Sequence, residues 1–380
     1  MIRSFLLLVF YMFILLACSE NKSEILRINY QEFNIRKHAL KHFSELGEIE
    51  KVVQLETNDH CLVSYAINVV ASNNGDIYIA EKDSQKKVFR FDKNGTFISS
   101  YGVVGEGPGE SKEIACFDID HDQSLYISGG NKIIKYNANG TFVKELKTDF
   151  DGQDIKVIGD KIYVYNSYPS FNNDKSSKHE IYIYSLDLAF VRGIGTFDER
   201  LMKHSFFPFN VLTKCKDKCF YSKLYNLGFR SIDPNKLSIS DVSIPISSDK
   251  LDGLFKKKRL KSKERNQINA LTHFFMFFYG SDNYIFGAER CRSKNILSFW
   301  KINPELKTID KYPFTKLIHY LEDDKAEICF DRVSGAYKDG VILAIEDSER
   351  FQNYKNKEPL FKKIKFELSD NPILVFLRIN

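Results

Sequence analysis

Apolar and polar positions follow the same order in two stretches of the chain, spaced about 45–48 residues apart. The first is GDIYIAEKDSQKKVFRFDKNGTFISSYG (Gly75–Gly102) and the second is SLYISGGNKIIKYNANGTFVKELK (Ser124–Lys147). Each contains an apolar strand, a short polar turn, a second apolar strand and then Asn-Gly-Thr-Phe. Asn-Gly between alternating runs is a strong hairpin signal, because both residues tolerate a positive φ. Each stretch is therefore predicted to form hairpins of antiparallel strands.

Four weaker copies of this pattern follow along the chain. They are DKIYVYNSY with HEIYIYSLDLAFVRGIG, KCFYSKLYNLGFRSIDPNKL, DNYIFGAERCRSKNILSFWKINPELKTIDKY, and DGVILAIEDSERF with NPILVFLRIN. One such unit cannot bury both of its faces, whereas units stacked radially bury a continuous core. Strands alternate with turns and not with helices, which disfavours a doubly wound parallel sheet. The pattern predicts an all-β fold, a six-bladed β-propeller.

One segment departs from the strand pattern. SSDKLDGLFKKKRLKSKERNQINALTHFF (247–275) places leucines and phenylalanines near helical spacing and carries seven lysines and arginines between positions 256 and 265. We predict a short inserted helix near 249–268. Its basic face is interpreted as solvated, with contact to an anionic glycan, lipid headgroup or partner as the alternative.

The N-terminus has the features of an export signal. Arg3 precedes an apolar run from Phe5 to Leu16, which is too short for a bilayer-spanning helix of about 20 residues. Leu15-Leu16-Ala17-Cys18 resembles a bacterial lipobox, in which Cys18 is lipidated and becomes the mature N-terminus. We divide the chain into a signal peptide (1–17), a tether and lead-in (18–45) and the propeller (46–380). Ser19 and Glu20 permit residence at the outer membrane, facing the periplasm or the surface.

Net charge and cysteine content limit the classes of binding partner and of cross-link to be expected. The formal net charge is +5 with acids and bases mixed, so no concentrated basic face for nucleic acid is expected. Six cysteines follow Cys18, and their 15 possible pairings stay open. For Cys215 and Cys219, which are predicted to face each other across a hairpin tip, free thiols are favoured over a disulfide or a metal site. The cysteines that complete the set are Cys61, Cys116, Cys291 and Cys329.

The stretch YGVVGEGPGE (101–110) is rich in turn residues. It does not match a phosphate-binding loop, because Pro108 stands where the lysine of that motif is required and no helix pattern follows. Glu106 and Glu110 would also repel phosphate. We predict a connector between two blades, whose glycines provide turns with positive φ. The connector residues are Gly102, Gly105, Gly107, Pro108 and Gly109.

Several motifs together resemble a known family. The opening FSEL, VQLET and GDIYIAE, the GEGPGE element and the terminal NPILV strand are similar to those of six-bladed β-propeller lipoproteins of Gram-negative bacteria, distant relatives of NHL-repeat propellers. The likeness extends from about Ile25 to Asn380 and implies a propeller held in the cell envelope. It supplies no catalytic residues, since that family is largely without assigned chemistry.

Candidate catalytic groups are scattered. The eight histidines occur singly, and His121 in FDIDHDQ is interpreted as a solvated turn residue rather than a ligand. No nucleophile motif is present. We expect a lipid-anchored, monomeric, non-catalytic binding or scaffold module without a cofactor, with a glycan, peptide or envelope protein as its partner. The alternative is a metal-dependent lyase or hydrolase with its site at the central channel.

Overall fold

A computed structural model provides the structure of the 380-residue chain. It describes residues 29–30, 32–38, 45–66, 68–82, 85–166, 179–196, 210–222, 228–233, 235, 238–243, 254, 261, 263–264, 267, 273–291, 296–312, 318–320, 327–329, 332–352, 355, 359–367 and 370–380.

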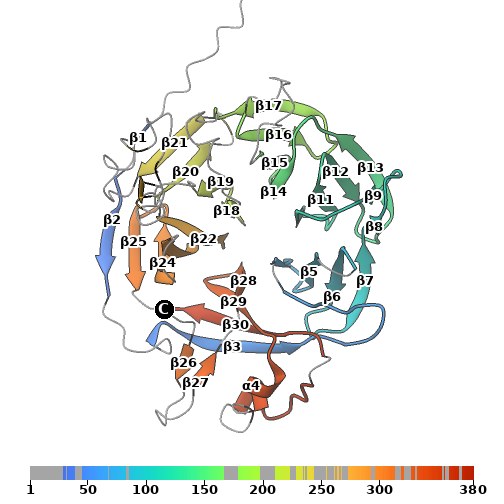
Figure 1. The fold of residues 1–380 in the computed structure, drawn as a ribbon, viewed down its shortest axis with the longest axis vertical. Helices are drawn as coiled ribbons and strands as arrows, with labels where there is room; N and C mark the ends of the chain where they lie inside the picture. Colours follow the sequence, from blue (N-terminus) through green and yellow to red (C-terminus); the bar gives the residue numbers. More distant parts are fainter. Residues whose placement is uncertain are drawn as a thin grey trace, which may run out of the picture.

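Six blades, each with four antiparallel strands, form a ring, as the sequence predicts (Figure 1). In the first three blades, the chain runs outward from the innermost strand to the edge. Blade 1 contains β4 (Val69–Ala71), β5 (Ile77–Glu81), β6 (Lys87–Phe91) and β7 (Phe97–Tyr101). Blade 2 contains β10 (Cys116–Ile119), β11 (Leu125–Gly129), β12 (Lys132–Tyr136) and β13 (Phe142–Lys147). Blade 3 contains β14 (Gly152–Ile158), β15 (Lys161–Asn166), β16 (Ile181–Ser185) and β17 (Phe190–Ile194).

The other three blades complete the ring. Blade 4 contains β18 (Leu212–Cys215), β19 (Lys218–Ser222), β20 (Gly228–Asp233) and β21 (Ser238–Ser243). Blade 5 contains β22 (His273–Gly280), β23 (Ile285–Cys291), β24 (Ile296–Asn303) and β25 (Thr308–Tyr312). Blade 6 contains β28 (Arg332–Tyr337), β29 (Gly340–Ile345), β30 (Ile373–Ile379) and β3 (Gly47–Gln54).

Both ends of the propeller meet in blade 6. The outer strand β3 comes from the N-terminal part of the chain, and it pairs in antiparallel fashion with the C-terminal β30, with Gly47 opposite Ile379. Figure 1 shows these two strands side by side at the bottom of the ring. The pairing closes the ring with main-chain hydrogen bonds and leaves no free end between first and last blade.

The lead-in before β3 is partly strand. β1 (Asn29–Tyr30) pairs in parallel with the outer strand β21, and β2 (Asn34–Lys37) pairs in parallel with the outer strand β25. Arg36 and His38 both contact the carboxylate of Asp310 on blade 5. Part of the predicted tether region 18–45 therefore lies against the rim of blades 4 and 5.

Several short elements lie outside the six blades. They are β8 (Val103–Val104), β9 (Glu110–Ser111), β26 (Ile318–Tyr320), β27 (Glu327–Cys329), the helix α4 (Ser348–Gln352) and a 3-10 turn (Pro359–Phe361). The helix predicted near 249–268 falls almost entirely outside the described residues, and the few positions described there do not establish it. Among the described residues, no helix has the length and apolar character of a membrane span.

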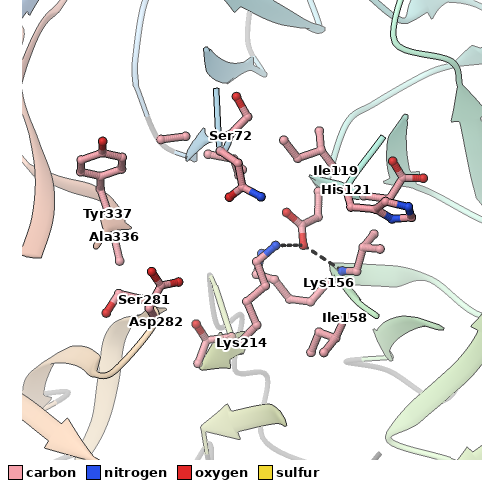
Figure 2. Close-up of a pocket in the computed structure, with 18 of the residues that line it drawn as sticks. Ser72, Ile119, His121, Lys156, Ile158, Lys214, Ser281, Asp282, Ala336 and Tyr337 are labelled. Carbon is pink, nitrogen blue, oxygen red and sulfur yellow. Dashed lines mark hydrogen bonds and ion pairs between the residues drawn. The ribbon is translucent and has the colours of Figure 1, made fainter. Parts of the chain in front are cut away.

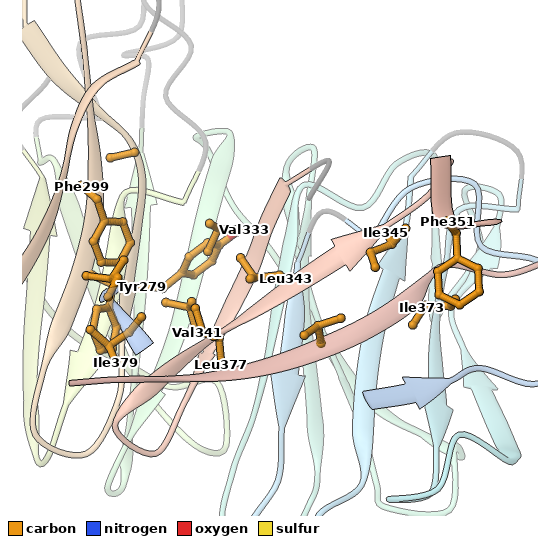
Figure 3. Packing of buried hydrophobic residues seen from close by; sticks show 14 of the residues in the cluster. Tyr279, Phe299, Val333, Val341, Leu343, Ile345, Phe351, Ile373, Leu377 and Ile379 are labelled. Atoms are coloured by element: carbon orange, nitrogen blue, oxygen red, sulfur yellow. The ribbon is translucent and has the colours of Figure 1, made fainter. Parts of the chain in front are cut away.

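The hydrophobic core consists of six clusters, one between each pair of neighbouring blades. The cluster between blades 5 and 6 joins Phe299 and Tyr279 to Val341, Leu343 and other side chains of the closing sheet (Figure 3). The remaining clusters repeat this arrangement around the ring. The blades bury their faces against their neighbours, as the radial stacking argument predicts, and Phe351 of α4 and Phe361 of the 3-10 turn add to the cluster between blades 5 and 6.

Aromatic and basic side chains lie opposite each other on the middle strands of three blades. Tyr78 faces Arg90 in blade 1, and the two groups are 5.5 Å apart. The pairs Tyr126–Lys135 and Tyr221–Arg230 repeat this geometry in blades 2 and 4. Arg90 also donates to the carbonyl of Ala138 in blade 2. The cation–π pairs thus recur as a structural feature of the repeat, and Arg90 also ties one blade to the next.

Asn371, the first residue of the terminal NPILV motif, holds the segment that enters blade 1. Its Nδ2 donates to the carbonyls of Glu56 and Cys61, each at 2.6 Å, and its Oδ1 accepts from the Val63 N–H at 2.7 Å. The side chain is almost fully buried. An amide is the one uncharged side-chain group that provides two donors and an acceptor at this point.

Candidate functional site: the central cavity

A cavity of about 790 Å³ lies on the axis of the ring. Its wall is built from the innermost strands of all six blades and from the turns that follow them, such as Asp120–His121, Gly159–Asp160 and Ser281–Asp282. Figure 2 shows Ser72, Lys156, Lys214 and Tyr337 around this space, each from a different blade. The volume is within the range of about 300–1,000 Å³ that is usual for ligand sites.

Asp118 on β10 connects three blades beneath the cavity. Its Oδ2 accepts the Val157 N–H of blade 3 at 2.8 Å and pairs with the Lys214 ammonium of blade 4 at 3.4 Å. The carboxylate is 1% exposed, while the Lys214 side chain is 40% exposed. One oxygen is therefore used in holding the inner strands together, and the ammonium that neutralises it remains accessible from the cavity.

Asp154 on β14 repeats this role one blade further. Its Oδ2 accepts the Leu212 N–H of blade 4 at 2.7 Å, and its Oδ1 is 3.6 Å from the Lys156 ammonium. Lys156 also donates to the Ile155 carbonyl at 3.1 Å. Both side chains are at least nine-tenths buried. Acidic residues in otherwise apolar inner strands thus each accept a main-chain N–H from the inner strand of the following blade.

Lys156 stays charged in this setting. Burial by itself lowers the pKa of the ammonium, but negative charge on Cys116 when it ionises, and on Asp154 and Asp118, acts in the opposite direction and the pKa is raised above its usual value. Lys156 and Lys214 both extend into the cavity (Figure 2). The cavity floor therefore carries two ammonium groups. The accessible Lys214 ammonium lies 3.4 Å from the Asp118 carboxylate, a distance that a ligand hydroxyl could bridge, whereas Asp154, the partner of Lys156, is buried and does not line the cavity.

The Cys116 thiol lies beside this cluster. It donates to Asp154 Oδ1 at 2.9 Å and accepts from the Asn68 amide at 3.0 Å. Burial, followed by the charge of Asp154, raises the pKa of the thiol to about 11. A thiol held protonated at neutral pH is a poor nucleophile, so Cys116 is a structural group.

Because the pKa of the Cys116 thiol is raised, the free energy of unfolding is expected to fall at alkaline pH. In the unfolded chain the thiol ionises near its ordinary pKa of 9.0, whereas in the folded protein burial raises the pKa to about 11. Stability from this group is complete below pH 9 and is lost between pH 9 and 11, to a total of about 3 kcal/mol at most. We expect urea midpoints to fall between pH 8 and 10.5, and to fall less in Cys116→Ser. An equal slope in both proteins would contradict this assignment.

Charges around the cavity are balanced. Four lysines (156, 214, 216 and 338) and four aspartates (118, 120, 160 and 282) line it. Amides and hydroxyls occupy the positions between them, including Asn73, Gln123, Ser72 and Thr213. His121 is exposed at the rim and pairs with Asp122. Within the described part of the chain, no three His, Cys, Asp or Glu side chains are grouped as a metal site requires.

Comparison with known proteins identifies the family. The domain of unknown function DUF4934 matches residues 27–378. The chain belongs to the DUF4934 family. None of the curated proteins matches its sequence.

Solved structures share the fold of this DUF4934 protein. A Bacteroides fragilis protein described as an exported protein superimposes with a TM-score of 0.68 at 16% identity, over 91% of this chain and 99% of the other. A DUF4221 protein from Bacteroides vulgatus gives a TM-score of 0.51 at 10% identity, over 89% and 99%. At these identities the likeness concerns the fold alone, and the six-bladed propeller is confirmed.

The glycine-rich stretch of the DUF4934 protein lies between the outer strand β7 and the next inner strand β10, and it contains the short parallel pair β8 and β9. Only two of its four glycines have positive φ: Gly102 at 93° and Gly109 at 73°. Gly105 and Gly107 do not, so the prediction that all of them provide such turns is wrong. Both instead lie close to the Glu110 carboxylate, which accepts the Gly107 N–H.

A lysine that the sequence argument missed holds this connector. The Lys132 ammonium donates to the carbonyls of Glu106, Gly107 and Glu110 at 3.1–3.3 Å and pairs with Glu145 at 3.4 Å. The loop therefore wraps its carbonyls around a cation from blade 2. This arrangement explains why a compact Gly-Pro-Gly-Glu turn is needed here, where side chains would keep the carbonyls apart.

Two matched substitutions test this account of the connector. A Cβ at Gly109 would lie 2.8 Å from the Phe142 ring on a backbone of positive φ, so Gly109→Val should lower the free energy of unfolding by about 2 kcal/mol or more. Gly107→Val should cost less, because only the Glu110 carboxylate has to move. Chemical denaturation of both variants gives the comparison. A larger loss in Gly107→Val would contradict the account.

The other predicted positions can be placed in part. Cys18 lies outside the described residues. Cys61, Cys116, Cys215 and Cys219 are buried free thiols. Cys215 pairs across the hairpin with Lys218, and Cys219 pairs with Lys214, so the two cysteines point to opposite faces of the blade. The prediction that they face each other is wrong, because the turn contains two residues rather than three.

Proposed function

We propose that this DUF4934 protein is a lipid-anchored envelope module that binds a polar ligand in its central cavity and does not catalyse a reaction. The observation that carries the proposal is the cavity floor, where Lys156, Lys214 and Asp118 from three blades meet in a site of ligand size. A rigid ring that brings side chains of different blades to one point is a preorganised site, which lowers the cost of binding.

The carboxylates and the thiol best suited to catalysis already take part in hydrogen bonds within the protein. Asp118 and Asp154 each accept a main-chain N–H from the next blade, and the Cys116 thiol is held protonated between Asn68 and Asp154. A general base needs a lone pair directed at its substrate. These contacts favour binding over acid–base or nucleophilic chemistry.

Native mass spectrometry of the protein purified from its own cells tests the binding. We expect a non-covalent adduct in the wild type that is reduced at least tenfold in Lys214→Met, which removes a cavity ammonium. Lys144→Met is the matched control, since Lys144 lies on the outer strand β13, away from the cavity wall, and donates to the Asp187 carbonyl. Lys214→Met also removes the charge that neutralises Asp118, so a second variant that leaves this pair intact is needed. Lys338→Glu at the exposed rim serves as that variant. Equal adducts in all four proteins, or none in the wild type, would refute the proposal.

The anchor rests on Leu15-Leu16-Ala17-Cys18 at the end of the apolar N-terminal run. Cys18→Ala should abolish incorporation of a clickable fatty acid and release the protein from the outer-membrane fraction, because acyl chains contribute about 0.8 kcal/mol per buried methylene. Ser19→Ala is the control and should remain acylated. Acylation that persists in Cys18→Ala would exclude this anchor.

A further inference from the structure

We infer that the ligand of the central cavity is an uncharged saccharide, a molecule rich in hydroxyl groups. This inference rests on the proposed binding function and adds the chemical class of the ligand. It comes from the balance and the spacing of the charged groups around the cavity, and from the apolar surface between them.

The four lysines and four aspartates of the wall leave no excess of either charge. A carboxylate or phosphate that drew the Lys214 ammonium away from Asp118 would leave that buried carboxylate without its counter-charge. An ammonium ligand that drew Asp118 away would do the same to Lys214. Breaking such pairs below the surface costs several kcal/mol. A neutral ligand avoids this penalty because it leaves the pairs intact.

The ion pair at the cavity floor is loose. The Lys214 ammonium is 3.4 Å from the Asp118 carboxylate, longer than the 2.7–2.9 Å of a tight charge-assisted hydrogen bond. A hydroxyl donates one hydrogen bond and accepts two, so it can accept from the ammonium and donate to the carboxylate at the same time. Neighbouring hydroxyls of a sugar ring present this combination repeatedly.

Apolar surface alternates with these polar groups. Val69, Val70, Ile119 and Ile158 line the cavity wall, and Tyr337 stands at its mouth (Figure 2). The Tyr337 ring is held edge-on against Phe376, with 5.2 Å between the ring centroids. Sugars carry C–H faces beside their hydroxyl edges, so a wall of mixed character suits them better than a uniformly polar or apolar ligand.

An array of immobilised oligosaccharides tests the class of ligand. It pairs neutral glycans with uronic-acid glycans of the same length, and it is probed with the mature protein, Lys214→Met, Lys338→Glu and Lys144→Met. We expect retention on neutral glycans, at least tenfold weaker for Lys214→Met and unchanged for Lys144→Met. Lys338→Glu should keep the preference for neutral over acidic glycans, because the floor is unaltered.

Three outcomes of the glycan array would contradict the inference. Retention on acidic glycans alone, on no glycan, or equally by Lys214→Met and wild type would overturn it. The native mass spectrum separates this failure from that of the proposed function. A cavity-dependent adduct with no retention on the array would mean that the protein binds a ligand of another class, whereas no adduct would remove the binding function itself.

Discussion

Replacing Asn371 by aspartate is expected to lower the free energy of unfolding by about 3 kcal/mol or more. The two side chains have nearly the same shape, so packing is retained. The Asn371 Nδ2 group donates to two carbonyl oxygens at 2.6 Å, and a carboxylate would place an acceptor against both of them without a donor. The carbonyls of Glu56 and Cys61 would lose their donor, while the bond from the Val63 N–H to Oδ1 would remain.

Asn139→Asp is the matched control for this substitution. Asn139 lies in the exposed β12–β13 turn, where its Oδ1 accepts from the Thr141 N–H and hydroxyl. An aspartate preserves both bonds, so the change should stay within about 0.5 kcal/mol. Urea denaturation at neutral pH measures both variants. A loss below 1 kcal/mol in Asn371→Asp would show that the terminal motif is not a structural lock.

Asp154→Ala should have a comparable effect, of about 3–5 kcal/mol, by a different mechanism. The substitution leaves the buried Lys156 ammonium without its nearest carboxylate and the Leu212 N–H without its acceptor. Lys156→Met alone removes a buried cation and should cost less, because its stem is replaced by an apolar side chain of similar length.

A double-mutant cycle isolates the charge pair. In Asp154→Ala with Lys156→Met no unpaired ammonium remains, so the double variant should be more stable than Asp154→Ala alone. The coupling is expected to exceed about 1 kcal/mol, as for directly contacting buried groups. Additive losses in the cycle would mean that Asp154 acts through the other hydrogen bonds that it accepts and that the buried Asp154–Lys156 pair is energetically silent.

The local part of the fold could be predicted from the sequence because its signals are local. The Asn94-Gly95 and Asn139-Gly140 turns, with their alternating flanks, define two of the hairpins and the length of the repeat. The N-terminal strand β3 was not predicted as the outer strand of blade 6. Its partner β30 lies more than 300 residues further along the chain, and no local pattern specifies that pairing.

The cavity floor was missed for a related reason. Asp118, Lys156 and Lys214 lie on three blades, and only closure of the ring brings them together. A signal was nevertheless present, since FDID and QDIKV place charged residues inside apolar inner strands, where they need a partner. The structure of the connector could not be predicted for the same reason. Its carbonyls surround Lys132, which belongs to the next blade and lies outside the glycine-rich stretch.

Photo-crosslinking in living cells tests the central claim most directly. A benzophenone amino acid replaces Tyr337 at the cavity mouth in one strain and Phe190, which is 61% exposed on the outer strand β17, in another. The proposal predicts that irradiation gives a defined small-molecule or glycan adduct at position 337 and none at position 190. Adducts at position 190 alone, or none at position 337, would show that the central cavity is not the ligand site.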